Sequence, residues 1–241
     1  VSWYTPAYYD YDNSDVPFVD WSIAMNERND TDLATLTSIS YGIPEKYMSD
    51  DQMSTFATEM IKLGLRGATV FNSAGDNGAN GESQKTTCNN VEALPSFPSG
   101  CPYVVSVGAT QGPEAGKTEV VCSTDNPQEY GGPSAITSGG GFSNFFARPW
   151  WQDTAVSEYF KNVPFQPKAG SYNTSGRGYP DISTLGNNYE IVVGGNVTGV
   201  DGTSCSSPVT TALFSIISGH RVAKGLPKLG WITPLLYYPV A

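Results

Sequence analysis

The sequence predicts an α/β fold in which a mainly parallel sheet is covered by helices on both faces. Short apolar stretches that end in glycine-rich turns alternate with longer stretches whose apolar residues recur at helical spacing. The chain has 241 residues, 39% hydrophobic and 12% aromatic, which suits a packed core. Because no internal repeat or break in composition divides it, we expect a single domain over residues 1–241.

The first half of the chain alternates predicted strands with predicted helices. Strands are expected at 2–5, 36–42, 68–75 and 103–110, and helices at 17–27 and 50–67. In the second helix, Phe56, Met60 and Leu63 recur on one face, as in a helix that packs on a sheet. Interleaving of this kind is typical of parallel strands joined by crossover helices.

The second half is expected to be less regular. The glycine run at 138–141 is interpreted as part of a long irregular region, followed by a helix at 150–163. A strand at 189–195 precedes the last helix, in which Val209, Leu213 and Ile216 recur at helical spacing up to Gly225.

Ser204 is a candidate nucleophile at the start of this last helix. Ser204, Ser206 and Ser207 are candidate N-caps, and Pro208 suits the first helical turn. The single histidine, His220, follows sixteen residues later, which in a helix is roughly 24 Å away from Ser204. A hydrogen bond spans about 3 Å, so the sequence excludes a Ser-His-Asp triad within this chain.

Three loops are expected to meet beyond the carboxyl ends of the strands, where ligands of open α/β sheets bind. These are residues 40–42 (SYG), 73–78 (SAGDNG) and 202–204 (GTS). They are distant in sequence, and the predicted architecture brings them together.

The charge balance excludes some classes of partner. Asp and Glu total 23 against 13 Lys and Arg, which gives a net charge of −10. Nucleic acid and anionic membrane surfaces are therefore not expected partners. No apolar run approaches the ~18 residues of a membrane span, so membrane insertion is not expected.

Sequons and cysteines point to a secreted or lysosomal protein. Glycosylation sequons occur at Asn29, Asn173 and Asn196. A disulfide between Cys88 and Cys101 closes the shortest loop, although spacing alone does not fix the connectivity. No cysteine and histidine cluster has the spacing of a zinc site, so no metal site is expected within the chain.

Two stretches resemble motifs of the subtilisin superfamily. Residues 201–208 (DGTSCSSP) resemble its nucleophile turn, and residues 70–78 (VFNSAGDNG) resemble its oxyanion-hole strand. Subtilisins have Asn after the glycine, whereas this chain has Asp76. That exchange, together with the missing histidine, resembles the sedolisins, or serine-carboxyl peptidases. Three further stretches agree in order, at 97–110, 138–151 and 175–183.

The resemblance implies a subtilisin-like three-layer fold and a peptidase that forms an acyl-enzyme at acidic pH. Ser204 would be the nucleophile, and Asp76, when protonated, would donate a hydrogen bond to the oxyanion. In the family a glutamate is the base, with an aspartate four residues later. No Glu-x-x-x-Asp pair occurs here, so we expect that pair before Val1 and no activity from residues 1–241 alone.

The resemblance also implies ligands and partners. A structural calcium ion (Ca²⁺) is expected, with ligands beyond Ala241, so the domain is interpreted as truncated at both ends. Peptide or protein substrates are implied, as is an N-terminal propeptide inhibitor. Ser40, Tyr41 and Gly42 resemble the strand end that pairs with substrate backbone, and an ordinary strand exit has the same pattern.

The glycine run Ser138, Gly139 and Gly140 is a further candidate for substrate binding, because glycine allows close backbone approach. A plain flexible loop accounts for it as well. Within the family, the motifs are most similar to the tripeptidyl-peptidase branch, which releases tripeptides from free N-termini. The alternatives are an acidic endopeptidase of the same family and an inactive member that acts as a binding glycoprotein.

Overall fold

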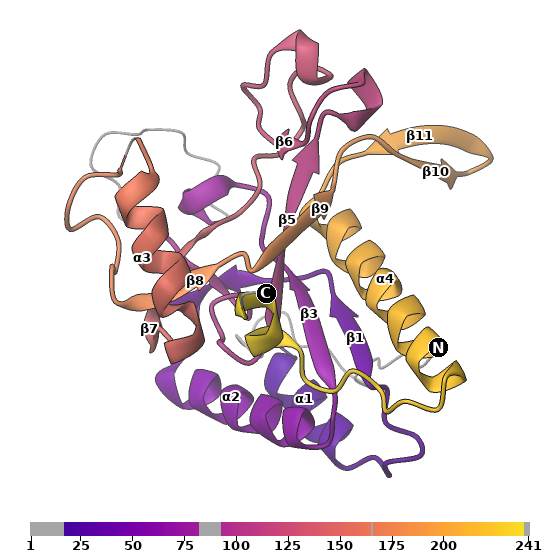
Figure 1. Ribbon diagram of the computed structural model, residues 1–241. Helices are drawn as coiled ribbons and strands as arrows, with labels where there is room; N and C mark the ends of the chain where they lie inside the picture. The colour runs from indigo at the N-terminus through magenta and orange to yellow at the C-terminus, as the bar shows by residue number, and fades with distance from the viewer. Residues whose placement is uncertain (1–16, 82–92, 165, 239–241) are drawn as a thin grey trace.

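A computed structural model describes residues 17–81, 93–164 and 166–238 (Figure 1). The helices are α1 (Phe18–Asn26), α2 (Asp50–Leu65), α3 (Asp153–Asn162) and α4 (Thr203–Ala223). The central sheet contains β1 (Leu36–Ile39), β3 (Thr69–Ser73), β5 (Val105–Gln111), β6 (Val120–Val121) and β9 (Ile182–Leu185). Two-stranded sheets are formed by β2 (Ile43–Pro44) with β4 (Ser96–Phe97), β7 (Gly141–Ala147) with β8 (Gly176–Tyr179), and β10 (Tyr189–Val193) with β11 (Asn196–Val200).

Four strands of the central sheet run parallel, in the order β1, β3, β5 and β9. Ile39 of β1 lies opposite Asn72 of β3, and Ser73 lies opposite Val107 of β5. β6 pairs antiparallel with the end of β5. The carboxyl ends of β1 and β3 therefore lie side by side, and the loops that follow them leave the sheet at one edge.

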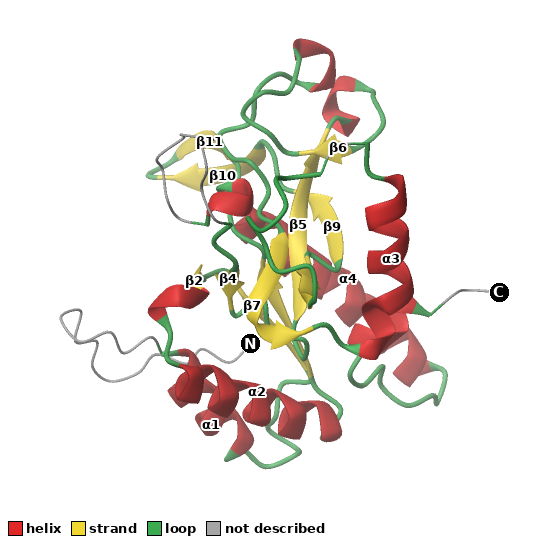
Figure 2. Cartoon of the chain, turned by 90° about the vertical axis from the view of Figure 1, so that its left-hand side faces the viewer, coloured by secondary structure: helices red, strands yellow, loops and turns green. Residues whose placement is uncertain are grey.

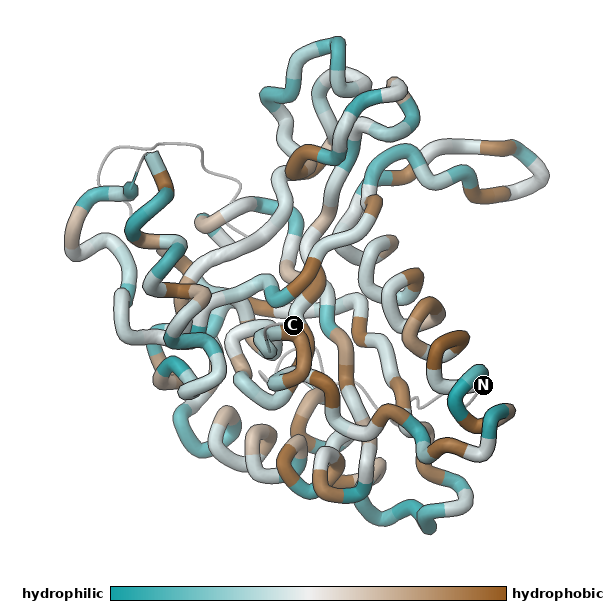
Figure 3. The backbone as a smooth tube through the Cα atoms, in the orientation of Figure 1, coloured by the Kyte–Doolittle hydropathy of each residue, from teal (hydrophilic) through white to brown (hydrophobic). Residues whose placement is uncertain are grey.

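Helices cover both faces of the sheet, which confirms the predicted layers. Adjacent residues of a strand point to opposite faces. Val70 packs with α1 and α2 in one apolar cluster, whereas Phe71 packs on the other face with Phe214 of α4. Figure 2 shows α1 and α2 together at one end of the strands, and Figure 3 shows apolar residues along β1 and β3.

The best-predicted helix, α2, has a strong local signal at its start. Ser49 accepts a hydrogen bond from the Gln52 backbone while the Gln52 side chain accepts one from the Ser49 backbone, which is a capping box. Phe56, Met60 and Leu63 are buried on one face, as predicted from their spacing. None of the described helices has the length and apolar character needed to cross a bilayer.

The second half of the chain differs from the expectation in two places. The strand predicted at 189–195 is β10, which pairs only with β11 in a hairpin that stands apart from the sheet (Figure 1). Its place in the sheet is taken by β9, which begins at the end of the stretch 175–183 and carried no strand prediction. Part of the irregular region is also a strand, β7, paired with β8. The strands β5 and β9 pair residues such as Val107 and Ile182, and β7 and β8 pair residues such as Gly141 and Tyr179, which are distant in the chain, so local pattern gives little sign of these two pairings. The predicted strand at 2–5 lies outside the described residues.

A buried ion pair joins β5, the β8–β9 turn and the last turn of the described chain. Arg177 Nη2 lies 2.6 Å from Asp181 Oδ2, and both side chains are fully buried. Asp181 also accepts hydrogen bonds from the Ser106 backbone and from the Tyr237 hydroxyl, at 2.7 and 2.5 Å. Removing one member of such a pair leaves an uncompensated buried charge.

We therefore expect Asp181→Ala to lower the free energy of unfolding by about 3–5 kcal/mol. The matched control is Glu158→Ala, which breaks the exposed pair with Lys161 and should cost under about 1 kcal/mol. Urea unfolding of the complete protein measures both. A loss for Asp181→Ala no larger than that of the control would contradict the role assigned to the buried pair.

Candidate active site

A cavity of about 320 Å³ opens at the carboxyl edge of the sheet. It brings together the three loops predicted to converge, since its lining includes Ser40, Tyr41, Gly42, Asp76 and Ser204. Tyr179 also lines it, and the Tyr179 hydroxyl accepts a hydrogen bond of 2.8 Å from the Ser96 backbone. Burial raises the pKa of Tyr179, so this hydroxyl stays neutral at acidic and neutral pH.

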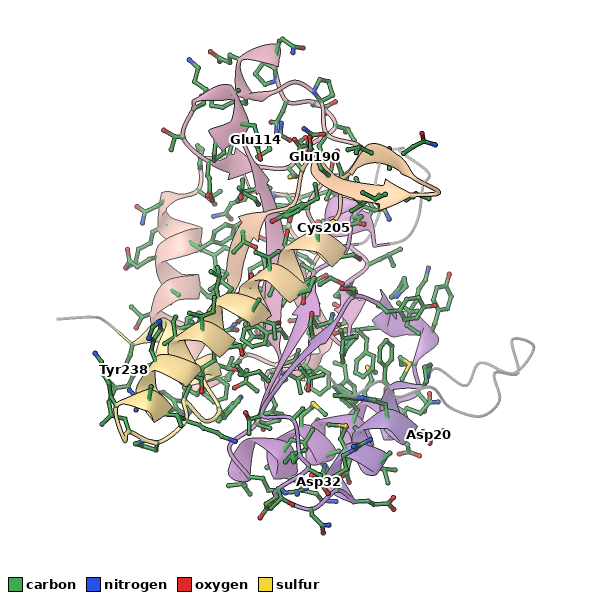
Figure 4. All side chains as sticks on the ribbon, turned by 90° about the vertical axis from the view of Figure 1, so that its right-hand side faces the viewer. Asp20, Asp32, Glu114, Glu190, Cys205 and Tyr238 are labelled. Carbon is green, nitrogen blue, oxygen red and sulfur yellow. The ribbon has the colours of Figure 1, made fainter. Side chains whose placement is uncertain are left out.

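Ser204 is the second residue of α4, and its side chain is exposed to the cavity. Backbone N–H groups at this end of a helix have no partner within the helix, so a partial positive charge faces the cavity. Ser204 Oγ lies 3.5 Å from the Ser40 carbonyl oxygen. Among the described residues, no carboxylate or histidine forms a hydrogen bond with Ser204 Oγ. Figure 4 marks this turn through the neighbouring Cys205, below the hairpin that carries Glu190.

The start of α4 corrects the predicted caps. The N-cap residue is Gly202, and Ser204, Ser206 and Ser207 all lie within the helix, so Pro208 falls in the second turn. Gly202 has no side chain with which to cap the helix. The capping acceptor comes instead from another loop, because Thr203 N donates a hydrogen bond of 2.8 Å to Asp76 Oδ1. A cap supplied from residue 76 leaves no signal near residue 203.

Asp76 is held in place by one of its two carboxyl oxygens. Oδ1 accepts from both the backbone N–H and the hydroxyl of Thr203, each at 2.8 Å. Oδ2 takes part in neither bond. The position where a Cβ on Gly202 would stand is 3.6 Å from Asp76 Oδ2 and 3.6 Å from Ser204 Cβ. The acid and the serine therefore lie on the same side of the sheet and line one cavity.

The glycine run behind this loop supports Asp76. Gly139 N donates to the Gly75 carbonyl at 2.6 Å, and Thr137 N donates to the Asp76 carbonyl at 3.0 Å. A Cβ on Gly139 would collide with the Ala74 carbonyl oxygen, so only glycine allows this approach. Ser138 Oγ accepts from Ala109 N. Ser138, Gly139 and Gly140 are not among the residues that line the cavity, unlike Ser40, Tyr41 and Gly42.

The first turns of α4 rest on the sheet through hydroxyl groups. Ser206 Oγ donates to carbonyl oxygens of β9, and Ser207 Oγ lies 2.9 Å from Ser38 Oγ of β1. A Cβ on Gly186 would stand 2.5 Å from Ser206 Oγ, so this contact also needs a small neighbour. The small residues of the GTSCSSP stretch thus allow the start of α4 to approach the strands closely.

Asp201 was not singled out as a site residue, yet it anchors the loops that lead to Ser204. Its carboxylate accepts hydrogen bonds from Ser134 Oγ, Ala135 N, Asn187 Nδ2 and Asn188 N. Burial alone would raise the pKa of Asp201, but these bonds outweigh it and hold the pKa below its ordinary value. An aspartate directly before Gly-Thr-Ser is the one sequence signal that could have indicated it.

The predicted glycosylation and disulfide residues differ in their burial. Asn29 and Asn196 are exposed, whereas Asn173 is half-buried and its Nδ2 donates to the Ser143 carbonyl. Cys88 lies outside the described residues, so its pairing with Cys101 stays a prediction. Cys101 is fully buried, which raises the pKa of its thiol to about 12.

Within residues 17–81, 93–164 and 166–238, no three His, Cys, Asp or Glu side chains come together as a metal site requires. The calcium ligands expected after Ala241 lie outside this sequence, so the calcium ion stays a prediction.

Comparison with known proteins decides the relationship. The chain is 37% identical over 227 residues to tripeptidyl-peptidase 1 of cattle (Bos taurus), and 35% identical over 222 residues to that of Homo sapiens. The chain is a homologue of tripeptidyl-peptidase 1. The alignments cover 93% and 92% of this chain and 37% of each relative, so the chain spans just over a third of their length. No protein-family profile matches.

Among solved structures, the chain is similar to a Pseudomonas sedolisin, described as a serine-carboxyl proteinase complexed with two molecules of pseudo-iodotyrostatin. The TM-score is 0.67 at 22% identity, over 90% of this chain and 55% of that one. This likeness confirms the predicted subtilisin-like fold. The homology to tripeptidyl-peptidase 1 confirms the family resemblance.

A buried glutamate holds the segment that follows residues 40–42 of this tripeptidyl-peptidase 1 homologue. Glu45 accepts hydrogen bonds from Ser143 Oγ at 2.6 Å and from Asn144 N at 2.9 Å. Burial raises the pKa of Glu45 above its ordinary value of 4.5, and these hydrogen bonds offset only part of that rise. The folded state therefore binds the Glu45 proton more tightly than the unfolded state does.

The stability contributed by Glu45 is fully present below pH 4.5 and is lost as the pH rises through the raised folded-state pKa. Glu45→Gln mimics the protonated form, so it should flatten the decline of unfolding free energy above pH 4.5. Urea unfolding across a pH series measures this. Glu158→Gln, at an exposed carboxylate, is the control and should keep the wild-type slope. An unchanged slope in Glu45→Gln would refute the assignment.

Proposed function

We propose that this chain forms the nucleophile and oxyanion part of a serine-carboxyl peptidase that hydrolyses peptide bonds at acidic pH. The observation that carries the proposal is the shared cavity of Asp76 and Ser204 at the N-terminus of α4. Acyl transfer needs two groups on this side of the substrate: a nucleophile, and a hydrogen-bond donor to the carbonyl oxygen as it becomes negative.

In the proposed reaction, Ser204 Oγ attacks the scissile carbonyl carbon and passes its proton to a carboxylate base. That base is the family's Glu, paired with Asp in a Glu-x-x-x-Asp arrangement that this sequence does not contain. The C–N bond then breaks and the leaving amine takes up the proton, which leaves an acyl-enzyme for water to hydrolyse. The N-terminus of α4 stabilises the negative charge that forms on the carbonyl oxygen.

Asp76 is proposed to donate a hydrogen bond to the oxyanion through Oδ2. Oδ1 already accepts two hydrogen bonds from Thr203, so a proton on the carboxyl group belongs on Oδ2. Only the neutral acid can donate to an oxyanion, which accounts for the acidic working range. The contact with Thr203 fixes the carboxyl group beforehand, so no reorganisation is needed when charge develops.

The proposed substrates are peptides or proteins whose backbone pairs with residues 40–42, which line the cavity. The homology to tripeptidyl-peptidase 1 supports release of tripeptides from N-termini, with an acidic endopeptidase as the alternative. It also supports a secreted or lysosomal location, with glycans at Asn29 and Asn196, which are exposed. A propeptide inhibitor and a structural calcium ion are proposed on the same family grounds.

The second candidate is an inactive binding glycoprotein. It is favoured by the absence of a partner for the Ser204 hydroxyl among the described carboxylates. The residues encoded before Val1 discriminate between the two candidates, since a Glu-x-x-x-Asp pair there supports the enzyme and its absence supports the binding protein.

Substitution at the two site residues tests the mechanism in the complete protein. Ser204→Ala should abolish acyl-enzyme formation. Asp76→Ala should lower kcat on the order of 10²–10³-fold, the effect of losing one oxyanion donor. Asp76→Asn should lose less, because its amide oxygen can still accept from Thr203 while its amide nitrogen donates to the oxyanion. Turnover by Asp76→Ala equal to that of the wild type at low pH would remove Asp76 from the mechanism.

The substrate class is tested with paired peptides that differ only in a free or an acetylated N-terminus. Mass spectrometry of the products should show tripeptides from the free peptides and little cleavage of the blocked ones. Equal internal cleavage of both sets would support the endopeptidase instead.

A further inference from the structure

We propose that Ser40 is a positioning residue for the nucleophile, because its hydroxyl replaces a helical hydrogen bond that Pro208 removes. This inference rests on the proposed function of Ser204. It concerns the side chain of Ser40, which is distinct from the backbone role assigned above to residues 40–42.

The defect in α4 lies at the nucleophile itself. In an α-helix each carbonyl oxygen accepts from the N–H four residues later. The partner of the Ser204 carbonyl would be residue 208, which is proline and has no N–H. The backbone of the reacting residue would therefore lack its helical bond, next to the cavity.

Ser40 supplies the missing donor. Ser40 Oγ donates to the Ser204 carbonyl oxygen at 3.0 Å, across 164 residues of sequence. The neighbouring contact between Ser38 Oγ and Ser207 Oγ, at 2.9 Å, joins β1 to the next turn of α4. The end of β1 is thus attached to α4 both at the nucleophile and one turn later.

The bond constrains the direction in which Ser204 faces. Ser204 Oγ lies 3.5 Å from the Ser40 carbonyl oxygen, so the two serines face each other through both main-chain and side-chain atoms. A hydroxyl that can rotate freely must be oriented for attack, and small misplacements of reacting groups lower rates strongly. Fixing the Ser204 carbonyl from β1 fixes the backbone from which its side chain projects.

A double-mutant cycle in the complete protein isolates this bond. Ser40→Ala should lower kcat about fivefold, the effect of one neutral hydrogen bond, with KM nearly unchanged. In Pro208→Ala, residue 208 regains an N–H that can donate to the Ser204 carbonyl, so adding Ser40→Ala should change kcat less than twofold. Ser40→Thr, which keeps the hydroxyl, should recover most of the kcat lost in Ser40→Ala.

Thr58→Ala is the matched control, because Thr58 Oγ1 also donates to a helix carbonyl, that of Ser54, on a helix away from the cavity. It should leave kcat unchanged. An effect of Ser40→Ala that is equal in both backgrounds, or that appears in KM alone, would overturn the inference.

A serine-reactive fluorophosphonate probe separates this inference from the proposed function. If wild-type Ser204 is labelled, Ser40→Ala should slow labelling about fivefold and the Pro208→Ala background should suppress that effect. If wild-type Ser204 is not labelled, the proposed function fails and the positioning role fails with it. In that case urea unfolding of the wild type, Ser40→Ala, Pro208→Ala and the double variant still reports on the hydrogen bond. Additive changes in the free energy of unfolding would disprove that Ser40 replaces the bond that Pro208 removes.

Discussion

The contact between Asp76 and Thr203 is the interaction on which the site depends. It joins the loop after β3 to the first N–H of a helix that has glycine at its N-cap. The same carboxyl group that caps the helix is thereby oriented towards the cavity. A helix N-terminus favours one negative charge. In the proposed reaction an ionised Asp76 would compete with the oxyanion for this favourable position, whereas a proton on Oδ2 would let Asp76 donate a hydrogen bond to the oxyanion.

The first turns of α4, which carry the proposed nucleophile, are attached to the sheet by polar contacts rather than by large apolar side chains. Ser206 and Ser207 bring hydroxyl groups against β9 and β1, and Ser40 reaches the backbone of Ser204. Hydrogen bonds have defined directions, so they fix the rotation of the helix more closely than apolar packing would. The outward face of α4 is different, since Leu213, Ile216 and Ile217 are exposed there.

Local sequence signals were sufficient to predict the elements whose own residues supply a cap or a clear apolar periodicity. α2 and the strands β1, β3 and β5 follow from the sequence, and so does the meeting of residues 40–42, Asp76 and Ser204 at one sheet edge. The sequence did not indicate β9 or the cap of α4, because both depend on residues distant in the chain. The glycine run at 138–140 was predicted to allow close approach of a substrate, and the fold shows Gly139 in close contact with Ala74 of the chain itself.

The central claim is that a neutral Asp76 holds the oxyanion while Ser204 is acylated. A crystal structure of the complete protein at acidic pH, with a peptide aldehyde bound covalently to Ser204, tests it most directly. We expect the hemiacetal oxygen within about 2.5–3.0 Å of Asp76 Oδ2, the range of an O–H···O hydrogen bond. A hemiacetal oxygen bound elsewhere, with Asp76 Oδ2 turned away from it, would contradict the account.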